Sequence, residues 1–271
     1  MTVDVEDYFQ VSAFEKHVAQ ADWDAKELRV DRNVKRILEL FARHDVKATF
    51  FVLGWVAQRL PKMVREIASA GHEIASHGFN HTRVTQQERD AFRADVTATK
   101  RLLEDTVGAE IIGYRAATYS ITEDNLWALD VLAETGHRYS SSIYPIKHDL
   151  YGIPAAPRFR FQVGASKLTE VPITTVAMFG RNWPAGGGGY FRLFPYSLSR
   201  WALRRVNETE HQSAVFYFHP WEIDPEQPRI EGVGWKTRFR HYVNLGKLES
   251  RVANLLRDFR WNRLDTVFGL R

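Results

Sequence analysis

Short apolar runs alternate with longer amphipathic stretches along the chain, and the two patterns predict different elements. Runs that are rich in β-branched and aromatic residues and bounded by turn-forming residues predict strands. Seven runs fit this description: "TVDV" near the start, then 47–54, 72–76, 109–116, 137–144, 168–176 and 213–220. Most of them are only four to eight residues long, which is typical of strands.

The amphipathic stretches between these runs predict helices. Four stretches follow the helical pattern, namely 34–43, 61–70, 87–104 and 125–135. The first places Ile37 and Phe41 on one face, and the second begins with Pro61 and precedes Gly71, as helices commonly do. Because strands and helices alternate, we predict an α/β fold with parallel strands joined by crossover helices, closed into a barrel or sheet. An α/β barrel of 271 residues commonly forms one domain, so we expect residues 1–271 to form a single domain.

The segment Arg181–Pro195, "RNWPAGGGGYFRLFP", follows neither pattern. Its four consecutive glycines argue against a helix or a central strand, because glycine weakens both. We therefore expect a loop, and two interpretations are open: a flexible connection, or a mobile loop that presents aromatic side chains to a sugar. The segment has neither the ending of a phosphate-binding loop nor a GxGxxG motif.

Composition narrows the chemistry. The chain has no cysteine, so any metal would be held by histidine and carboxylate. The net charge of +4 is mildly basic and the basic residues are scattered, so we expect no nucleic-acid partner. The sequence as given shows no signal peptide and no apolar run of about 18 residues, which predicts a cytoplasmic protein without a transmembrane segment.

The C-terminal region, 235–271, interleaves basic and aromatic residues. We expect a helical extension that packs its apolar face against the rest of the domain. Peripheral contact with a membrane surface, or with an anionic glycan, is the alternative for this region.

Polar residues gather where the predicted strands end. They are Asp4, Glu6 and Asp7 after the first strand, His77 and His81 after the run 72–76, Arg115 in the run 109–116, and His219 at the end of the run 213–220. Because the C-terminal ends of parallel strands meet on one face of the fold, we expect these residues to converge.

Each of these residues also has a purely structural explanation. The acids of 4–7 could form an acidic edge or cap a helix, and Arg115 could belong to a structural ion pair. His219 could be a core histidine, and the two histidines of "SHGFNH" could be solvated.

Their convergence favours a zinc site without thiolates. Two histidines four residues apart supply two ligands if Ser76–His81 turns helically, and a carboxylate of the first strand supplies a third. A fourth position stays open for water or substrate. The metal would polarise an acyl carbonyl, a second carboxylate would act as general base, and a histidine across the site as general acid.

Five segments together resemble the successive motifs of NodB-type polysaccharide deacetylases (carbohydrate esterase family four). In chain order they are "TVDVEDYF", "ATFFVLGW", "GHEIASHGFNH", "GYRAATYSI" and "VFYFHPWEID". The segments "GGGGYFRLFPYSLSRWALRRVN" and "HYVNLGKL…RDFRW" resemble deacetylases found with bacterial exopolysaccharide and PEP-CTERM/exosortase loci. The resemblance implies a distorted (β/α) barrel of about seven parallel strands. It also implies one divalent metal, usually zinc, and hydrolysis of an N-acetyl group from a sugar polymer.

The resemblance also implies roles for single residues. Asp4 resembles the family's general base, and Arg115 resembles the arginine that tethers this base. His77 and His81 resemble the metal ligands. His219 resembles the general acid that protonates the leaving amine.

Substrate-binding residues are expected at two places. Backbone N–H groups near Thr118 and Tyr119 would help to stabilise the oxyanion. The aromatic side chains of Trp183, Tyr190 and Trp221 are expected to contact the sugar.

Two assignments stay open at this point. The common motif has adjacent aspartates, but here Val5 follows Asp4. Strand alternation puts Glu6 on the same face as Asp4 and favours Glu6 as the metal ligand, whereas Asp7 could turn in if the strand ends early.

The partner that orients His219 is also open. The serines 140–142 stand near the position where the family has an aspartate. Glu222 and Asp224 are the candidates for this role.

The leading hypothesis is metal-dependent deacetylation of N-acetylhexosamine units in an exopolysaccharide or its precursor. One alternative is a metal-independent hydrolase of cyclic amides with the same fold, against which His77 and His81 argue. The other is a non-catalytic glycan-binding module, against which Asp4 and His219 argue.

Overall fold

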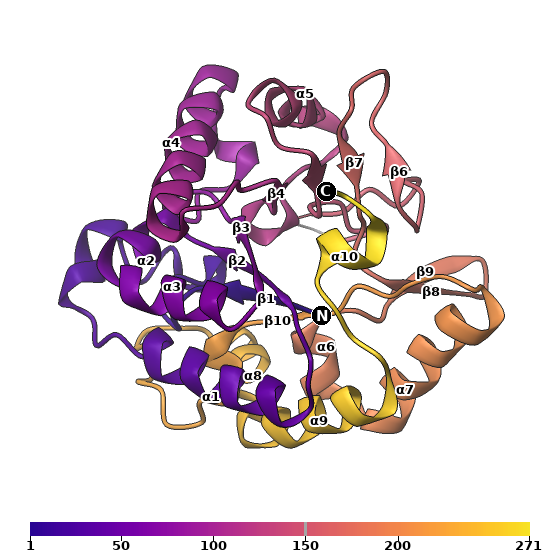
Figure 1. Ribbon diagram of the computed structural model, residues 1–271. Coiled ribbons are helices and arrows are strands. Elements are labelled where there is room, and N and C mark those ends of the chain that lie inside the picture. The colour runs from indigo at the N-terminus through magenta and orange to yellow at the C-terminus, as the bar shows by residue number, and fades with distance from the viewer. Residues whose placement is uncertain (149–150) are drawn as a thin grey trace.

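The central feature of the computed structural model, which describes residues 1–148 and 151–271, is a curled sheet of eight strands (Figure 1). The strand order is β10–β1–β2–β3–β4–β5–β7–β6, and every neighbouring pair is parallel except β7 and β6. The strands are β1 (Thr2–Val5), β2 (Thr49–Val52), β3 (Glu73–Ser76), β4 (Gly113–Tyr114), β5 (Tyr139–Ser140), β6 (Phe161–Gln162), β7 (Thr169–Glu170) and β10 (Tyr217–Phe218). The sheet therefore confirms the predicted barrel-like fold, with seven mutually parallel strands, each inside one of the predicted runs.

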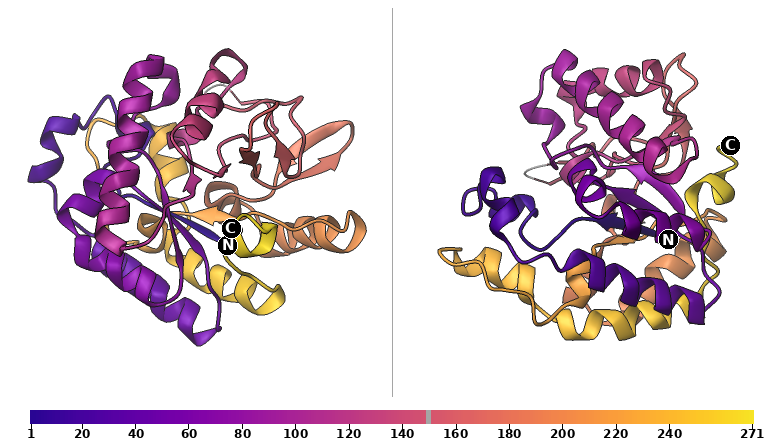
Figure 2. Two further views of the ribbon diagram at one scale, coloured as in Figure 1. Left: turned by 45° about the horizontal axis from the view of Figure 1, so that its top comes forward. Right: turned by 60° about the vertical axis from the view of Figure 1, so that its left-hand side comes forward.

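Helices cover the outside of this sheet, as both views of Figure 2 show. The first five are α1 (Val30–Arg43), α2 (Gly54–Arg59), α3 (Pro61–Ser69), α4 (Arg89–Val107) and α5 (Trp127–Glu134). All four predicted helices are confirmed. α2 was not predicted, and α1 begins four residues before the predicted start at Val34.

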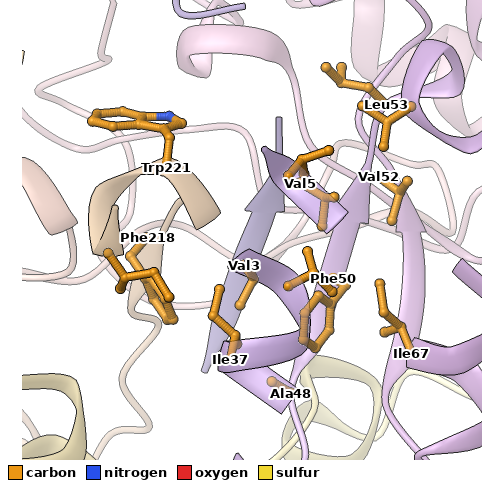
Figure 3. Packing of buried hydrophobic residues seen from close by; sticks show 14 of the residues in the cluster. Val3, Val5, Ile37, Ala48, Phe50, Val52, Leu53, Ile67, Phe218 and Trp221 are labelled. Carbon is orange, nitrogen blue, oxygen red and sulfur yellow. The ribbon is translucent and has the colours of Figure 1, made fainter. Parts of the chain in front are cut away.

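Alternation along β1 separates the core from the site. The side chains of Val3 and Val5 pack with those of β2 against the helix layer, where Figure 3 shows Val3 close to Ile37 of α1. Because successive side chains of a strand point to opposite faces, Asp4 lies on the other face, inside the curled sheet. The same alternation that fills the core thus directs Asp4 towards the site.

The gap between the two edges of the sheet is bridged by irregular chain. The N–H of Tyr217 donates to the carbonyl oxygen of Gly186 (2.7 Å), and the N–H of Val215 donates to Thr174 Oγ1 (2.6 Å). A separate hairpin of β8 (Thr175–Met178) and β9 (Arg181–Pro184) leaves the sheet between these contacts.

The segment 181–195 is not a loop, so this prediction is wrong. It contains β9 and the helix α6 (Gly188–Leu193), and α7 (Tyr196–Arg204) follows. The glycines are needed for close packing, because a side chain at Gly186 or Gly187 would clash with its neighbours. A Cβ on Gly186 would lie 2.4 Å from the carbonyl oxygen of Val215, and one on Gly187 would lie 2.9 Å from the ring of Tyr217. The glycines allow the backbone to approach β10, and flexibility is not what they provide.

The C-terminal extension forms three helices, α8 (Trp235–Tyr242), α9 (Leu245–Asp258) and α10 (Leu264–Phe268). α9 buries Leu248 and Val252 in the core, as its amphipathic pattern predicts. α10 lies at the N-terminal ends of the strands, where the N–H of Leu264 donates to Thr49 Oγ1 (2.8 Å). Within residues 1–148 and 151–271, no helix is both long and apolar enough to cross a membrane.

Candidate metal centre and active site

Three side chains that can bind a metal meet at the C-terminal ends of the strands. Glu6 follows β1, and His77 and His81 follow β3. Each of the three residues offers one possible ligand atom, and these atoms all lie within 4.8 Å of one another. No other group of three such residues is found in the described part of the chain. The geometry thus favours Glu6 over Asp7 as the metal carboxylate.

His81 reaches this group through an irregular loop. The helical turn considered for Ser76–His81 does not form, because Gly78 (φ 73°) and His81 (φ 54°) have left-handed backbone conformations. The carbonyl oxygen of Gly78 accepts a hydrogen bond from Gly54 at the start of α2 (2.9 Å), which fixes the loop. The rings of His77 and His81 consequently lie 5.2 Å apart, edge to face.

The hydrogen bond of His77 selects the nitrogen that faces the site. Its Nδ1–H donates to the carbonyl oxygen of Arg115 (2.8 Å), so that Nε2 is left with a free lone pair. Burial lowers the pKa of His77 to about 4, which favours the neutral imidazole. A neutral imidazole with a fixed tautomer is the form that binds a metal.

The environment of Glu6 is suited to a cation. Its Oε1 accepts a hydrogen bond from Trp221 Nε1 (3.2 Å), whereas Oε2 lies 3.0 Å from His81 Nε2 without a well-formed hydrogen bond. A buried carboxylate oxygen without a partner is costly. Although burial alone would raise it, the neighbouring histidines hold the pKa of Glu6 well below its usual range. Two imidazoles and one ionised carboxylate fit a divalent metal such as zinc.

Asp7 lies outside this group and caps a helix. Its Oδ2 accepts hydrogen bonds from the N–H groups of Arg29 (2.7 Å) and Val30 (2.9 Å) at the start of α1, and its Oδ1 from that of Tyr8 (2.9 Å). These bonds satisfy backbone donors that have no partner within the helix. They also explain why α1 begins earlier than its own sequence indicates.

Replacing Asp7 with alanine is therefore expected to lower the free energy of unfolding by about 2 kcal/mol, because it leaves buried N–H groups unpaired. Urea unfolding of the variant and the wild type measures this difference. The metal content of the folded variant should equal that of the wild type, and a loss of metal would instead identify Asp7 as a ligand.

Asp4 is held by a buried arginine. Arg115 Nη1 lies 2.5 Å from Asp4 Oδ1, and both side chains are buried. Arg115 also donates to the carbonyl oxygen (3.0 Å) and the hydroxyl (2.9 Å) of Ser141, and its guanidinium lies over the ring of Phe51. The hydroxyl of Tyr119 donates to Asp4 Oδ2 (3.4 Å). These contacts orient the carboxylate of Asp4 without making it a metal ligand.

His219 faces Asp4 and Glu6 from the end of β10. Its Nε2 lies 4.0 Å from Asp4 Oδ2 and 3.4 Å from Glu6 Oε1, whereas its Nδ1 lies 2.7 Å from Glu222 Oε1. Burial alone would lower the pKa of His219, but Glu6 and Glu222 outweigh this effect and raise it to about 9. The side chain is therefore suited to carry a proton that it can donate.

Of the two candidates for the orienting residue, the structure favours Glu222. The carboxylate of Asp224 instead accepts hydrogen bonds from Arg29 (2.7 Å) and Arg32 (3.1 Å), away from His219. Of the serines 140–142, Ser141 supports Arg115 by accepting two of its hydrogen bonds.

The residues predicted to bind substrate are not all accessible to a substrate. The backbone N–H of Tyr119, the residue after Thr118, donates to the carbonyl oxygen of Ala116 (3.0 Å). This N–H is therefore not free to bind an oxyanion. Trp221 is buried, and its ring stacks between His219 (centroids 5.2 Å apart) and His241 (4.1 Å). It forms a wall of the site and supports Glu6, so it is not an open platform for a sugar.

Trp183 and Tyr190 lie in a groove of about 910 Å³ between the β8–β9 hairpin, α6 and α7. Gly187 also lines this groove and packs against Tyr217, whose ring centroid lies 5.7 Å from that of His219. The groove is thus separated from the acid–base pair by one aromatic ring.

Sequence reasoning missed Arg192 and His241. Arg192 is buried and its Nε donates to Glu222 Oε2 (2.6 Å), and His241 packs behind Trp221. No local motif identifies either residue, because their partners lie far away in the sequence. The row of glycines before Arg192 was the one available signal, and its packing role could not be recognised without the fold.

Two family models together match nearly the whole chain. Residues 15–140 match "Polysaccharide deacetylase", and residues 141–269 match "Domain of unknown function (DUF3473)". His77, His81 and Arg115 fall within the first match, and His219 within the second. The candidate site therefore combines residues from both regions.

Curated relatives resemble part of the chain. A peptidoglycan-N-acetylglucosamine deacetylase from Bacillus cereus is 33% identical over 96 residues, which are 35% of this chain and 35% of that protein. A chitooligosaccharide deacetylase from a Bradyrhizobium species is 29% identical over 97 residues, which are 36% of this chain and 42% of that protein. The chain thus spans about a third to two fifths of the length of these relatives.

Solved structures show the same fold. A candidate polysaccharide deacetylase from Mycobacterium smegmatis has a TM-score of 0.63 and 20% identity, over 100% of this chain and 88% of that chain. Puue allantoinase has a TM-score of 0.58 and 16% identity, over 87% of this chain and 70% of that chain. Because the fold also occurs in a protein named an allantoinase, activity has to be argued from the site. Residues 15–140 are thus similar to polysaccharide deacetylases, residues 141–269 match a DUF3473 region, and the chain has the fold of these solved structures.

Proposed function

We propose that this chain is a metal-dependent N-deacetylase of a bacterial exopolysaccharide or its precursor, with N-acetylhexosamine units as the substrate. One observation carries the proposal: Asp4 Oδ2 and His219 Nε2 lie 4.0 Å apart, and His219 Nε2 lies 3.4 Å from Glu6, which forms a group with His77 and His81. The relatives that are named deacetylases of glycans support the substrate class. Zinc as the metal, and a place among PEP-CTERM/exosortase loci, belong to the same proposal.

Each polar side chain has a definable task in amide hydrolysis. A divalent ion held by Glu6, His77 and His81 would supply Lewis-acid polarisation of the acetamide carbonyl. The carboxylate of Asp4 takes a proton from the water whose oxygen adds to the carbonyl carbon. His219 donates a proton to the amine nitrogen as the C–N bond breaks, so the products are acetate and a free amino sugar.

Positioning is built into both proton-transfer groups. Arg115 and Tyr119 hold the two oxygens of Asp4 and direct its carboxylate into the site. A buried base and a partly buried acid beside the same metal-binding group suit the two proton transfers of this reaction. The intact metal group and acid–base pair argue against the metal-independent hydrolase and against the non-catalytic module.

A panel of substrates tests the activity. Purified protein is incubated with N-acetylglucosamine oligomers, peptidoglycan and acetylated exopolysaccharide, and the released acetate is measured. We expect release from at least one amino-sugar glycan. Ring opening of a cyclic amide such as allantoin, measured as the appearance of its carboxylate product, with no acetate released from any glycan, would contradict the proposal.

The groove around Trp183 is proposed to bind the sugar chain beyond the reacting unit. Trp183 is 47% exposed, as expected for an aromatic face that a sugar ring can cover. Trp183→Ala should raise the KM for long oligomers roughly 2- to 10-fold and leave kcat near the wild-type value, since it removes binding that is equal in ground and transition states.

Trp235→Ala is the matched control for this variant. Trp235 is also an exposed tryptophan, but it lies outside the lining of the groove. A KM that rises equally in both variants, or in neither, would remove Trp183 from the substrate path. The cytoplasmic location and the peripheral membrane contact stay predictions.

A further inference from the structure

We propose that Arg192 and Glu222 are positioning residues that hold the ring of His219 in its working orientation, and that Gly188 is required to leave room for the carboxylate of Glu222. The inference rests on the proposed function, in which His219 is the acid. It assigns to the DUF3473 region the task of completing the site.

Both carboxylate oxygens of Glu222 accept hydrogen bonds from neighbouring groups. Oε1 accepts hydrogen bonds from the ring Nδ1–H (2.7 Å) and the backbone N–H (3.1 Å) of His219, and Oε2 accepts one from Arg192 Nε (2.6 Å). A proton fixed on Nδ1 leaves the other ring nitrogen, Nε2, to face Asp4 and exchange the reacting proton. The carboxylate of Glu222 thereby sets both the tautomer and the plane of the imidazole.

Arg192 cannot follow a displaced carboxylate. It is 2% exposed, and its Nη1 donates to the carbonyl oxygens of His241 (2.7 Å) and Val243 (2.8 Å), where α8 ends. Its guanidinium also lies 5.4 Å from the ring centroid of Trp221, the wall of the site. A planar group held by several fixed acceptors defines one position for its carboxylate partner.

Gly188 also lies against the carboxylate of Glu222, in addition to Arg192 and His219. A Cβ at Gly188 would lie 2.3 Å from Oε1 and 2.6 Å from Oε2 of Glu222, which is far inside van der Waals contact. Because Arg192 and His219 already hold the carboxylate, it could yield only by breaking one of these hydrogen bonds. At the next residue, Gly189, a Cβ would meet nothing within 4 Å. The chain thus offers a matched pair of glycine variants in the same helix.

Leaving-group dependence separates positioning from a general structural defect. Gly188→Ala, Gly189→Ala and Glu222→Gln are compared on an N-acetylglucosamine oligomer and on 4-nitrophenyl acetate. The amide needs a proton on its leaving nitrogen, whereas 4-nitrophenolate leaves without one. Gly188→Ala and Glu222→Gln should lower kcat on the amide about 10²-fold. On the ester they should change it by less than about threefold, because the proton donor is not needed there. Gly189→Ala should match the wild type on both substrates.

Several outcomes would overturn the inference. These are full amide turnover in Gly188→Ala and Glu222→Gln, an equal loss on amide and ester, or a Gly189→Ala variant as impaired as Gly188→Ala. Melting temperatures and metal contents near the wild-type values show that the variants are folded and loaded.

A second readout does not depend on the activity. In the wild type and in Gly189→Ala, proton NMR should show a downfield resonance from the hydrogen-bonded ring Nδ1–H of His219, assigned by its absence in His219→Gln. Gly188→Ala should lose or shift this resonance. If the wild type releases no acetate, the proposed function fails, and the resonance still decides: an unchanged resonance in Gly188→Ala contradicts the positioning role.

Discussion

His77→Ala is expected to abolish both metal binding and turnover. The variant loses the imidazole whose Nδ1–H is fixed by the carbonyl oxygen of Arg115 and whose Nε2 faces Glu6 and His81. A three-ligand site reduced to two ligands loses most of its affinity for a divalent ion. We expect less than about a tenth of the wild-type metal content after dialysis, and acetate release reduced by at least about 10³-fold, because the metal supplies the carbonyl polarisation.

Elemental analysis and acetate release on the same sample check this prediction. His17→Ala is the control, since His17 is an exposed histidine outside the site. It should keep metal and turnover at the wild-type level. Full metal retention in His77→Ala would remove His77 from the ligand set.

Asp4→Asn is expected to separate the metal from the chemistry. Asparagine keeps the shape of the side chain, and an amide oxygen can still accept the hydrogen bond from Arg115 Nη1, but it cannot take a proton from water. Turnover should therefore fall by about 10²- to 10⁴-fold, the usual contribution of a general base, while the metal content stays unchanged.

Asp7→Asn is the matched control for this variant. Asp7 is a buried aspartate three residues away that caps α1 and does not belong to the metal-binding group. It should lose some stability but keep its turnover per folded molecule. An active Asp4→Asn variant would show that another group, or the metal alone, activates the water.

The sequence could predict the convergence of the site because that depends on one general property of the fold. Polar residues at the ends of predicted parallel strands, such as Asp4, His77 and His219, must meet on one face. The resemblance to a family then supplied their roles. What it could not supply was the choice between Glu6 and Asp7. That choice depends on the start of α1, which lies 22 residues from Asp7 in the sequence.

The orienting residues of His219 were out of reach for the same reason. Arg192 and Glu222 are 30 residues apart, and their contact exists only because α6 packs against the turn that follows β10. The glycines 186–189 were predicted to form a loop, because glycine is usually read as conformational freedom. Here the first three remove side chains at close approaches to Val215, Tyr217 and Glu222. A sequence shows that a residue has no side chain, but only the fold shows which neighbouring groups fill the space where a side chain would lie.

The proposed site draws on both matched regions. The part that matches polysaccharide deacetylases would supply two metal histidines and Arg115, and the DUF3473 region would supply the proton donor, its supports and the aromatic groove. Asp4 and Glu6 precede both matches. The site is therefore expected to need both regions.

The central claim is that one metal-centred site removes acetyl groups from an amino-sugar glycan. The most direct test measures metal content and acetate release on one sample with an active glycan substrate, first as purified, then after chelation, and again after zinc is returned. We predict that release disappears with the metal and returns with zinc. Acetate release that continues unchanged in the metal-free protein would contradict the account.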